Sequence, residues 1–256
     1  MSIALITGAS QGIGYELAKL FARDGHDLIL VARSADKLNA IGDELQRAYS
    51  NHVSVIVKDL SLPGAADELF AEVTAQGKQI DFLVNNAGFG LFGLFNETDW
   101  EKEAEMMQLN MVCLARLMKL FLKGMVDRGS GRILNIGSTA SFQPGPLMAV
   151  YYATKSFVLF LGEAVQNELK GTGVTVTTLC PGPTRTGFQE ASHLGKVPIL
   201  KLTMMDAAQV AKAGYRGLMK GKTVLVPGLI NKIMVFLVRI GPRSWVTFFV
   251  RKLFSS

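Results

Sequence analysis

The chain opens with the stretch Ile3–Gly14, which reads IALITGASQGIG, and this stretch decides the fold. Its first five residues have the apolar, β-branched composition of a buried strand, and a helix-period segment follows the stretch. The glycines are spaced G-x-x-x-G-x-G, which differs from the G-x-G-x-x-G of the common dinucleotide fingerprint. Gly8 and Gly12 permit a tight turn and the close approach of a pyrophosphate, while Gly14 lets the helix pack on the strand. The stretch therefore predicts a phosphate-binding turn, with an ordinary glycine-rich turn as the alternative.

The body of the chain repeats this alternation of short apolar runs and longer helix-period segments. We expect strands at Ile3–Thr7, Asp27–Ala32, Val53–Lys58, Phe82–Asn85, Arg132–Ile136, Thr175–Cys180 and Thr223–Val226. We expect helices at Gly14–Asp24, Ser34–Tyr49, Ala65–Gln76, Asp99–Arg128, Val150–Lys170 and Asp206–Met219. Such alternation predicts an α/β fold, a doubly wound parallel sheet of about seven strands with helices on both faces and ligands at the carboxyl ends of the strands.

Composition excludes several classes of protein. The 256 residues are 49% hydrophobic and 19% charged, a mixture too apolar for a disordered chain. Two cysteines rule out a disulfide scaffold, and three scattered histidines predict no metal site. We find no apolar run long enough for a membrane-spanning helix and no basic segment before the first strand, so we expect neither a membrane span nor a signal peptide, and a cytoplasmic protein.

Charge is distributed unevenly along the chain. The last acidic residue is Asp206, and nine basic residues follow it. The first 206 residues carry 18 basic and 21 acidic side chains, so the net charge of +6 belongs to the C-terminal part. No nucleic-acid-binding module accompanies these cations, so we expect no nucleic-acid partner. A membrane surface or an oligomer partner suits this part of the chain better.

The ends of the next strands indicate the type of cofactor. An acid after the second strand suits the ribose hydroxyls of NAD, whereas the arginine found here, Arg33, suits a 2′-phosphate. Arg33 and Ser34 therefore favour NADP(H) over NAD(H), with a solvated arginine as the alternative. Asp59-Leu60 closes the third strand and is placed to hold the adenine, and Asn85–Gly88 closes the fourth, where small and amide side chains can wall the cofactor.

The sharpest pattern is Tyr151-Tyr152-Ala153-Thr154-Lys155, preceded by Ser138. Residues four apart lie on one face of a helix, so Tyr151 and Lys155 are expected to project side by side. Each of these residues also has a structural interpretation. Ser138 can end a strand and Tyr151 can be a packed aromatic, so only the ordered set indicates a catalytic site.

Taken together, these motifs resemble those of the short-chain dehydrogenase/reductase family, in particular its broad group of generally described bacterial reductases. The resemblance covers Ile3 to about Gly228. It implies a single Rossmann-type domain at 1–228, usually assembled as a homodimer or homotetramer. One departure is Gln11, where some NADP-dependent members carry a basic residue, so the NADP(H) prediction depends on Arg33 and Ser34.

The resemblance implies a role for each site residue. Tyr151 is the acid/base; an ammonium at Lys155 lowers the pKa of that phenol and hydrogen-bonds the nicotinamide ribose. Ser138 holds the substrate oxygen, and Asn110 anchors a water that links Lys155 to solvent, although a locally satisfied helix amide is its alternative. The predicted cofactor contacts are Gly8, Ser10, Gly12, Ile13, Gly14, Arg33, Ser34, Asp59, Leu60, Asn86, Ala87, Gly88, Tyr151, Lys155, Pro181, Gly182, Thr184 and Thr186.

Apolar stretches flank this set. Phe89–Phe95 and Phe142–Met148 are expected to border the site, and neither carries a cation to grip an anionic substrate. We therefore expect an NADP(H)-dependent oxidoreductase acting on a hydrophobic carbonyl or alcohol. The alternatives are a cofactor-binding sensor or scaffold with little turnover, and an isomerase or lyase that uses the same tyrosine. A lid over 187–202, with Phe188, Leu194 and Ile199 facing inward, is expected to complete the pocket.

The extension 229–256 is apolar and basic. Gly241-Pro242 is expected to break it into two short helices, with Ser244 as the N-cap of the second. The extension packs on the same domain, on a partner subunit or on a membrane surface, which would place the protein peripherally at the inner membrane face. Of the last two, the sequence alone favours burial against a partner subunit, because oligomers are the usual owners of large apolar patches.

Overall fold

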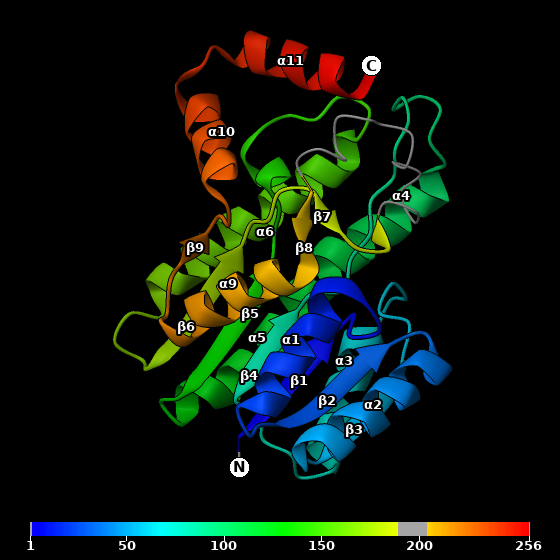
Figure 1. The fold of residues 1–256 in the computed structure, drawn as a ribbon, viewed down its shortest axis with the longest axis vertical. Coiled ribbons are helices and arrows are strands. Elements are labelled where there is room, and N and C mark those ends of the chain that lie inside the picture. Colours follow the sequence, from blue (N-terminus) through cyan, green and yellow to red (C-terminus); the bar gives the residue numbers. More distant parts are fainter. Residues whose placement is uncertain (1, 189–203, 256) are drawn as a thin grey trace.

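A computed structural model describes residues 2–188 and 204–255, and it contains a seven-stranded parallel sheet at its centre (Figure 1). The strands lie in the order β3-β2-β1-β4-β5-β6-β9. Their bounds are β1 Ile3–Thr7, β2 Asp27–Ala32, β3 Val53–Val57, β4 Phe82–Asn85, β5 Gly131–Ile136, β6 Val174–Leu179 and β9 Val224–Leu225. The predicted doubly wound, Rossmann-type sheet is confirmed, and the strand boundaries differ from the expected ones by one residue at most.

Helices cover both faces of the sheet. The first group is α1 Gly12–Arg23, α2 Ala35–Tyr49 and α9 Ala207–Met219, and the second is α3 Ala65–Ala75, α5 Leu114–Asp127 and α6 Ala149–Glu168. Alternate side chains of one strand face opposite sides of the sheet. Ala4 and Ile6 pack with the first group of helices, and Leu5 packs with the second. Burial on both faces explains why these strands are continuously apolar.

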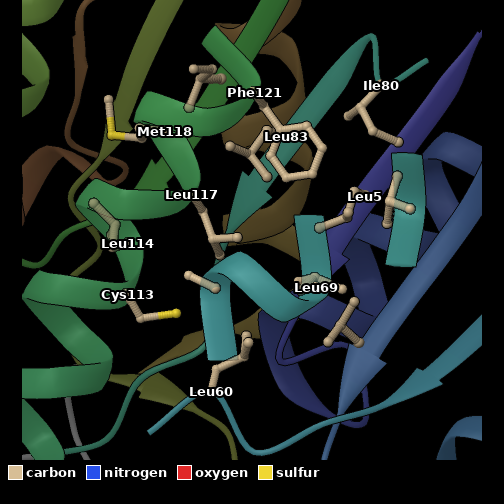
Figure 2. Packing of buried hydrophobic residues seen from close by; sticks show 14 of the residues in the cluster. Leu5, Leu60, Leu69, Ile80, Leu83, Cys113, Leu114, Leu117, Met118 and Phe121 are labelled. Atoms are coloured by element: carbon tan, nitrogen blue, oxygen red, sulfur yellow. The ribbon is translucent and has the colours of Figure 1, made fainter. Parts of the chain in front are cut away.

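The core on the second face is a well-packed set of aliphatic and aromatic side chains. Figure 2 shows Leu114, Leu117 and Phe121 of α5 lying toward the strands that carry Leu5 and Leu83. All five side chains are almost completely buried. This packing fixes α5 on the sheet, so the strand ends beside it keep a constant position.

The chain reverses direction across the sheet between β1 and β4. Strand β1 pairs with β2 on one side and with β4 on the other, so consecutive strands first run one way and then the other. In open α/β sheets this switch point leaves a crevice at the carboxyl ends of the strands. A second, two-stranded sheet of β7 Thr184–Arg185 and β8 Met205–Asp206, which the sequence did not predict, lies after β6.

The helix predicted over Asp99–Arg128 is divided into three parts. An α-helix α4, Trp100–Met107, passes into a π-helical segment, Gln108–Cys113, and then into α5. Asp99 caps the first part, because its carboxylate accepts a hydrogen bond of 2.9 Å from Lys102 N. The single continuous helix was therefore wrong in detail, since apolar spacing does not reveal a wider turn.

The C-terminal extension forms two helices, α10 Leu229–Ile240 and α11 Arg243–Ser255, which confirms the break at Gly241-Pro242. The N-cap prediction was wrong, because Ser244 lies inside the first turn of α11. Pro242 precedes this helix, and its carbonyl accepts hydrogen bonds from Trp245 N at 3.0 Å and Val246 N at 3.2 Å. Among the described residues, no helix has the length and apolar character needed to cross a bilayer.

Candidate active site

The glycine turn after β1 has the backbone that the sequence predicted. Gly8 and Gly12 have φ values of 65° and 58°, in the left-handed region that favours glycine. A Cβ atom at Gly14 would lie 2.3 Å from the Gly8 carbonyl oxygen, so the start of α1 is pressed against the turn. The helix begins at Gly12, two residues before the expected start, and its N-terminus therefore lies within the turn.

The turn is fixed to the end of β4 by partly buried hydrogen bonds. Asn86 Nδ2 donates to the carbonyls of Thr7 and Gly8, both at 3.0 Å, and the Thr7 hydroxyl accepts from Asn86 N and Ala87 N, both at 3.0 Å. The Asn86 amide group is thus occupied in bracing the turn, although its side chain was predicted to wall the cofactor. This bracing holds the glycines in place before any ligand binds.

One large cavity of about 640 Å³ lies along the carboxyl ends of the strands. Apart from Gly14 and Asn110, every predicted cofactor and catalytic residue lines it, which includes Ser10, Ile13, Leu60, Pro181, Gly182 and Thr184. Gly14 packs behind the turn, and Asn110 is buried behind Gly88. The sequence pattern therefore brings residues from six strand ends into a single space.

Basic side chains gather at the cavity end formed by β2, β3 and α2. Arg33 Nη1 lies 3.7 Å from Asp59 Oδ2, and Ser34 is the N-cap residue of α2 without a cap hydrogen bond from its side chain. Lys37, in the first turn of α2, also lines the cavity and was not predicted. The sequence could have indicated this place, because Lys37 follows Ser34 by three residues and therefore lies on the same turn of the helix.

The acid at this end is held in its ionised form. Burial acts to raise the pKa of the Asp59 carboxyl, but the side-chain and backbone hydrogen bonds from Ser61 and the charge of Arg33 outweigh it and hold the pKa below its usual value. The Ser61 hydroxyl donates at 2.6 Å and its backbone N–H at 3.0 Å. The Arg33 guanidinium is therefore positioned by a carboxylate while most of it remains exposed.

Tyr151 and Lys155 lie one turn apart on α6, with Lys155 Nζ 5.8 Å from the centroid of the Tyr151 ring. Lys155 is 6% exposed, and its ammonium donates to the Ile136 carbonyl at 2.9 Å. Ser138 lies beside the Tyr151 phenol, near enough to favour its ionised form. The three predicted catalytic side chains of this group are thus brought together at the end of β5.

The electrostatic effect of Lys155 differs from the prediction. Burial raises the pKa of Tyr151 to about 12, and the Ser138 side chain opposes this shift. The predicted lowering of this pKa by Lys155 is not found in the protein alone, where only Ser138 opposes the effect of burial, and desolvation lowers the pKa of Lys155 itself to about 8. At neutral pH Lys155 is still mostly protonated, and its ammonium is directed to the Ile136 carbonyl.

Ser138 has two structural partners beside Tyr151. Its hydroxyl accepts from Ala140 N at 3.1 Å, and it caps the 3₁₀ helix Thr139–Phe142. Its backbone N–H donates to Ser141 Oγ at 3.2 Å, and Ser141 Oγ donates to the Lys155 carbonyl at 2.7 Å. Ser138 therefore caps the short helix that follows β5 and also lies beside Tyr151.

Asn110 lies in the π-helical segment and contacts the backbone that follows β4. Its Nδ2 donates to the Phe89 carbonyl at 2.9 Å and to Thr154 Oγ1 at 3.1 Å, and its Oδ1 accepts from Phe89 N at 3.2 Å. A Cβ atom at Gly88 would lie 2.8 Å from Asn110 Oδ1 and 3.5 Å from Lys155 Nζ. These contacts agree with a locally satisfied amide. The water relay through Asn110 stays a prediction.

The apolar end of the cavity differs from the expected one. Of the stretch Phe89–Phe95 only Phe89 lines the cavity, and Phe95 is 68% exposed. Of Phe142–Met148 only Gln143 and Met148 do so. Within the predicted lid, Phe188 lies with its ring 5.3 Å from that of Tyr151, whereas Leu194 and Ile199 fall outside the described residues.

The C-terminal helices supply the lining that the sequence missed. Residues from α10 and α11 face the cavity, namely Ile230, Asn231, Met234, Val235, Val238 and Phe254. Phe254 is 8% exposed and packs 6.4 Å, centroid to centroid, from Tyr152, the neighbour of Tyr151. Apolar character alone predicted these helices but not the face that each presents inward, so no local signal identified these residues.

Within residues 2–188 and 204–255, no group of three or more His, Cys, Asp or Glu side chains is arranged to hold a metal ion. Cys113 and Cys180 are buried, and burial raises the pKa of each thiol to about 12. Neither cysteine is therefore available as a thiolate at neutral pH.

Comparison with known proteins agrees with this geometry. Residues 2–196 match the family described as short chain dehydrogenase. The NADP-dependent 3-hydroxy acid dehydrogenase of Salmonella typhi is 38% identical over 185 residues, which are 70% of this chain and 71% of that protein. The very-long-chain 3-oxoacyl-CoA reductase of Rattus norvegicus is 31% identical over 252 residues, 96% of this chain and 77% of that one.

The solved structures give the same result. A short-chain dehydrogenase from Sphingobium yanoikuyae in complex with NADPH superposes with a TM-score of 0.82 at 30% identity, covering 95% of this chain and 98% of that one. The sequence match spans the glycine turn, Ser138, Tyr151 and Lys155, and the structural match covers nearly the whole chain. The chain therefore belongs to the short-chain dehydrogenase/reductase family.

Proposed function

We propose that this oxidoreductase uses NADP(H) to interconvert a hydrophobic carbonyl compound and its alcohol, with Tyr151 as the acid/base. The observation that carries the proposal is the placement of Tyr151, Ser138 and Lys155 in the same cavity as the braced glycine turn. We expect the active form to be a homodimer or homotetramer, as family membership suggests.

The cavity suits a dinucleotide along its whole length. The turn at Gly8 and Gly12 is backbone without side chains, next to the N-terminus of α1, and this combination accommodates a pyrophosphate. Arg33, Ser34 and Lys37 would bind a 2′-phosphate, and Asp59-Leu60 would border the adenine. Thr186 and the backbone after Pro181 would hold the carboxamide, with Lys155 on the adjacent ribose. The bound nicotinamide supplies or accepts the hydride.

The chain's own residues provide the proton and the geometry. The Ser138 hydroxyl lies beside the Tyr151 phenol, so both can contact one substrate oxygen. With a pKa of about 12 the phenol is protonated at neutral pH, and it is ready to donate to an oxygen that develops negative charge during reduction. In the direction of oxidation the phenol must first lose its proton, so alcohol oxidation is expected to become faster as the pH rises.

The substrate class follows from the lining. Among the described residues that line the cavity, the charged ones are Arg33, Lys37, Lys58, Asp59 and Lys155, and all but Lys155 come from α2 or the segments that follow β2 and β3. The other end is lined by Phe89, Met148, Tyr152, Phe188 and the C-terminal helices. Because none of the described residues at this end carries a positive charge to pair with an anionic group, a bulky apolar carbonyl compound fits this end best.

The experiment follows NADPH absorbance with a panel of bulky apolar ketones, acyl compounds and small anionic keto acids, and it is repeated with NADH. We expect turnover with the apolar members and a preference for NADPH. A preference for small anionic substrates would contradict the substrate class. Dinucleotide binding without turnover of any carbonyl would favour the sensor.

Two matched variants test the acid. Tyr151→Phe removes one hydroxyl at the site, and Tyr152→Phe removes the hydroxyl of its buried neighbour, which also lines the cavity. Tyr151→Phe should lower kcat about a hundredfold to ten-thousandfold, with dinucleotide affinity unchanged, because it removes the proton donor. Tyr152→Phe should remain active. Full activity of Tyr151→Phe would move the acid elsewhere.

A further inference from the structure

The outer surface of the two C-terminal helices is apolar and exposed. Among the described residues, ten of the nineteen exposed large hydrophobic side chains lie on α10 and α11. They are between 50 and 73% exposed, and they are Leu229, Ile230, Ile233, Met234, Phe236, Leu237, Ile240, Trp245, Phe248 and Phe249. Figure 1 shows both helices at one end of the molecule, beyond the sheet and its covering helices. We call these ten side chains the C-terminal apolar surface.

Each helix has two distinct faces. On α10, Ile233, Leu237 and Ile240 follow the four- and three-residue spacing of one helix face and are exposed. The opposite side carries Val235 and Val238, which line the cavity.

The second helix repeats this arrangement. On α11, Val250 and Phe254 are buried against the cluster around Tyr152. Trp245 and Phe248 lie on the exposed side of the same helix. Both helices therefore present one apolar face to the active-site cavity and a second apolar face outward.

Cations border the outward face. Lys232 and Arg239 are seven residues apart, hence on one side of α10, and both are exposed. Arg243, Arg251 and Lys252 add three further exposed cations on α11, and no acidic residue follows Asp206 in the chain. An apolar face with tryptophan and phenylalanine, bordered by lysine and arginine, is the composition of helices that lie in the headgroup region of a membrane.

The charge pattern distinguishes a lipid surface from a second copy of the chain. A two-fold symmetric interface brings the same surface of both subunits together, so it would gather the cations of both copies with no acid from this segment to pair with them. Anionic lipid headgroups offer the opposite charge. The placement of charge therefore reverses the preference for a partner subunit that the sequence alone suggested.

We propose that the C-terminal apolar surface binds peripherally to a bilayer that contains anionic lipid. Helices of 12 and 13 residues are about 18 and 20 Å long, shorter than the hydrocarbon core of about 30 Å, so they lie in the interface and do not cross it. Ile230 and Met234 belong to this surface and also line the cavity, so binding places the mouth of the cavity at the lipid boundary. The proposal concerns binding alone and does not depend on the reaction.

The two tryptophans provide a direct test. Trp245 lies in the C-terminal apolar surface and is 65% exposed, and Trp100, at the start of α4, is 63% exposed and lies outside it. The variant Trp100→Phe leaves Trp245 as the only tryptophan, and Trp245→Phe leaves Trp100. On addition of phosphatidylcholine–phosphatidylglycerol vesicles, the emission of Trp245 should shift to the blue. The emission of Trp100 should stay unchanged.

Charge variants test the electrostatic part by co-sedimentation with the same vesicles. Lys232→Gln with Arg239→Gln should weaken sedimentation by about tenfold or more, since two cations near an anionic surface are lost. Lys212→Gln with Arg216→Gln removes the same charge from exposed positions on α9 and should change it little. Vesicles of phosphatidylcholine alone should bind the wild-type chain much more weakly than the mixed vesicles.

Three results would overturn the proposal. The first is no sedimentation of the wild-type chain with the mixed vesicles. The second is an equal loss of binding in both charge-variant pairs. The third is a wild-type oligomer that dissociates on Trp245→Ser but not on Trp100→Ser, because it would show that a second copy covers the surface. Because the readouts are emission and sedimentation, failure of this proposal is distinguishable from failure of the proposed reaction.

Discussion

The two ends of the active-site cavity are built in different ways. The nucleotide end consists of strand ends and one glycine turn, braced by Asn86 and Thr7 through partly buried hydrogen bonds of 3.0 Å. The apolar end takes much of its lining from α10 and α11, and no residue of α10 is buried. The first end is therefore rigid and determined by a short motif, whereas the second can change with the C-terminal helices while the sheet stays the same.

Lys155 lies where the two ends of the cavity meet, and its replacement tests how much the burial of its charge lowers the stability of the fold. Burial lowers its pKa from 10.5 to about 8, so between these values the unfolded chain binds more protons than the folded one. The free energy of unfolding should therefore rise with pH over this window, by roughly 2–3 kcal/mol.

In Lys155→Met this rise should disappear, and the variant should be more stable than the wild type at pH 7 although inactive. Urea unfolding at pH 7 and pH 9.5 measures both effects. Lys212→Met, at an exposed position on α9, is the control and should keep the wild-type pH dependence. An identical pH dependence in Lys155→Met and the wild type would show that Lys155 is not the group responsible.

A methyl group at Gly14 tests the rigidity of the nucleotide end. In Gly14→Ala the new Cβ would lie 2.3 Å from the Gly8 carbonyl oxygen and 2.5 Å from Asn86 Nδ2, so the braced turn must move. Overpacking of this kind costs about 1–3 kcal/mol, so dinucleotide affinity should fall by up to about a hundredfold. Isothermal titration with NADPH gives the affinity.

Gly124→Ala, on α5, is the matched control, because its Cβ meets nothing closer than 3.6 Å. This variant should bind NADPH like the wild type. Unchanged affinity in a folded Gly14→Ala would show that the turn is not the pyrophosphate site.

The cofactor preference should depend on the cationic end. Arg33→Ala with Lys37→Ala removes both charges proposed to bind the 2′-phosphate, and the KM for NADPH should rise about tenfold to a hundredfold. The KM for NADH should change little, because NADH lacks that phosphate. Arg47→Ala, at the far end of α2, should leave both values unaltered. Equal losses for the two dinucleotides would remove the NADP(H) assignment.

The smallest effect is expected at the apolar end. Phe254→Ala removes a buried ring from the cavity wall, so kcat/KM for bulky apolar ketones should fall about tenfold, with less change for small ketones. Phe249→Ala, exposed on the same helix, should have no effect in a lipid-free assay. If Phe249→Ala has the larger effect on kcat/KM, the assignment of inner and outer faces is wrong.

The nucleotide end could be predicted from the sequence because each of its parts is local. A strand, a glycine turn and the first turn of a helix are adjacent in the chain, so the places of Gly8 and Ser34 follow from the sequence alone. Lys37 was missed because the prediction of the cofactor considered only the residues directly after the strand. Lys37 lies one helix turn beyond the strand end. Parallel strands then bring these local units to one edge of the sheet.

The apolar end could not be predicted in the same way. Its wall combines Phe89, Tyr152 and Phe254, which are distant in the chain, and no spacing rule links them. The C-terminal helices carry apolar side chains around most of their circumference, so periodicity did not identify the inward face. The prediction of a lowered pKa for Tyr151 was wrong for a related reason, since the pKa depends on burial, and burial depends on packing that a motif does not reveal.

The π-helical segment Gln108–Cys113 has a consequence for the helices on either side of it. An extra residue in a turn changes the angular phase, so the side chains of α4 and α5 do not continue one common stripe. Leu117 and Phe121 pack α5 on the sheet, while Met106 of α4 belongs to the cluster against which Phe89, in the loop after β4, packs. Removal of one residue within 108–113 would restore a single helical phase and rotate one helix relative to the other by about 100°. Either the side chains of α5 would then lose their contacts with the sheet, or Asn110 would lose its hydrogen-bond partners.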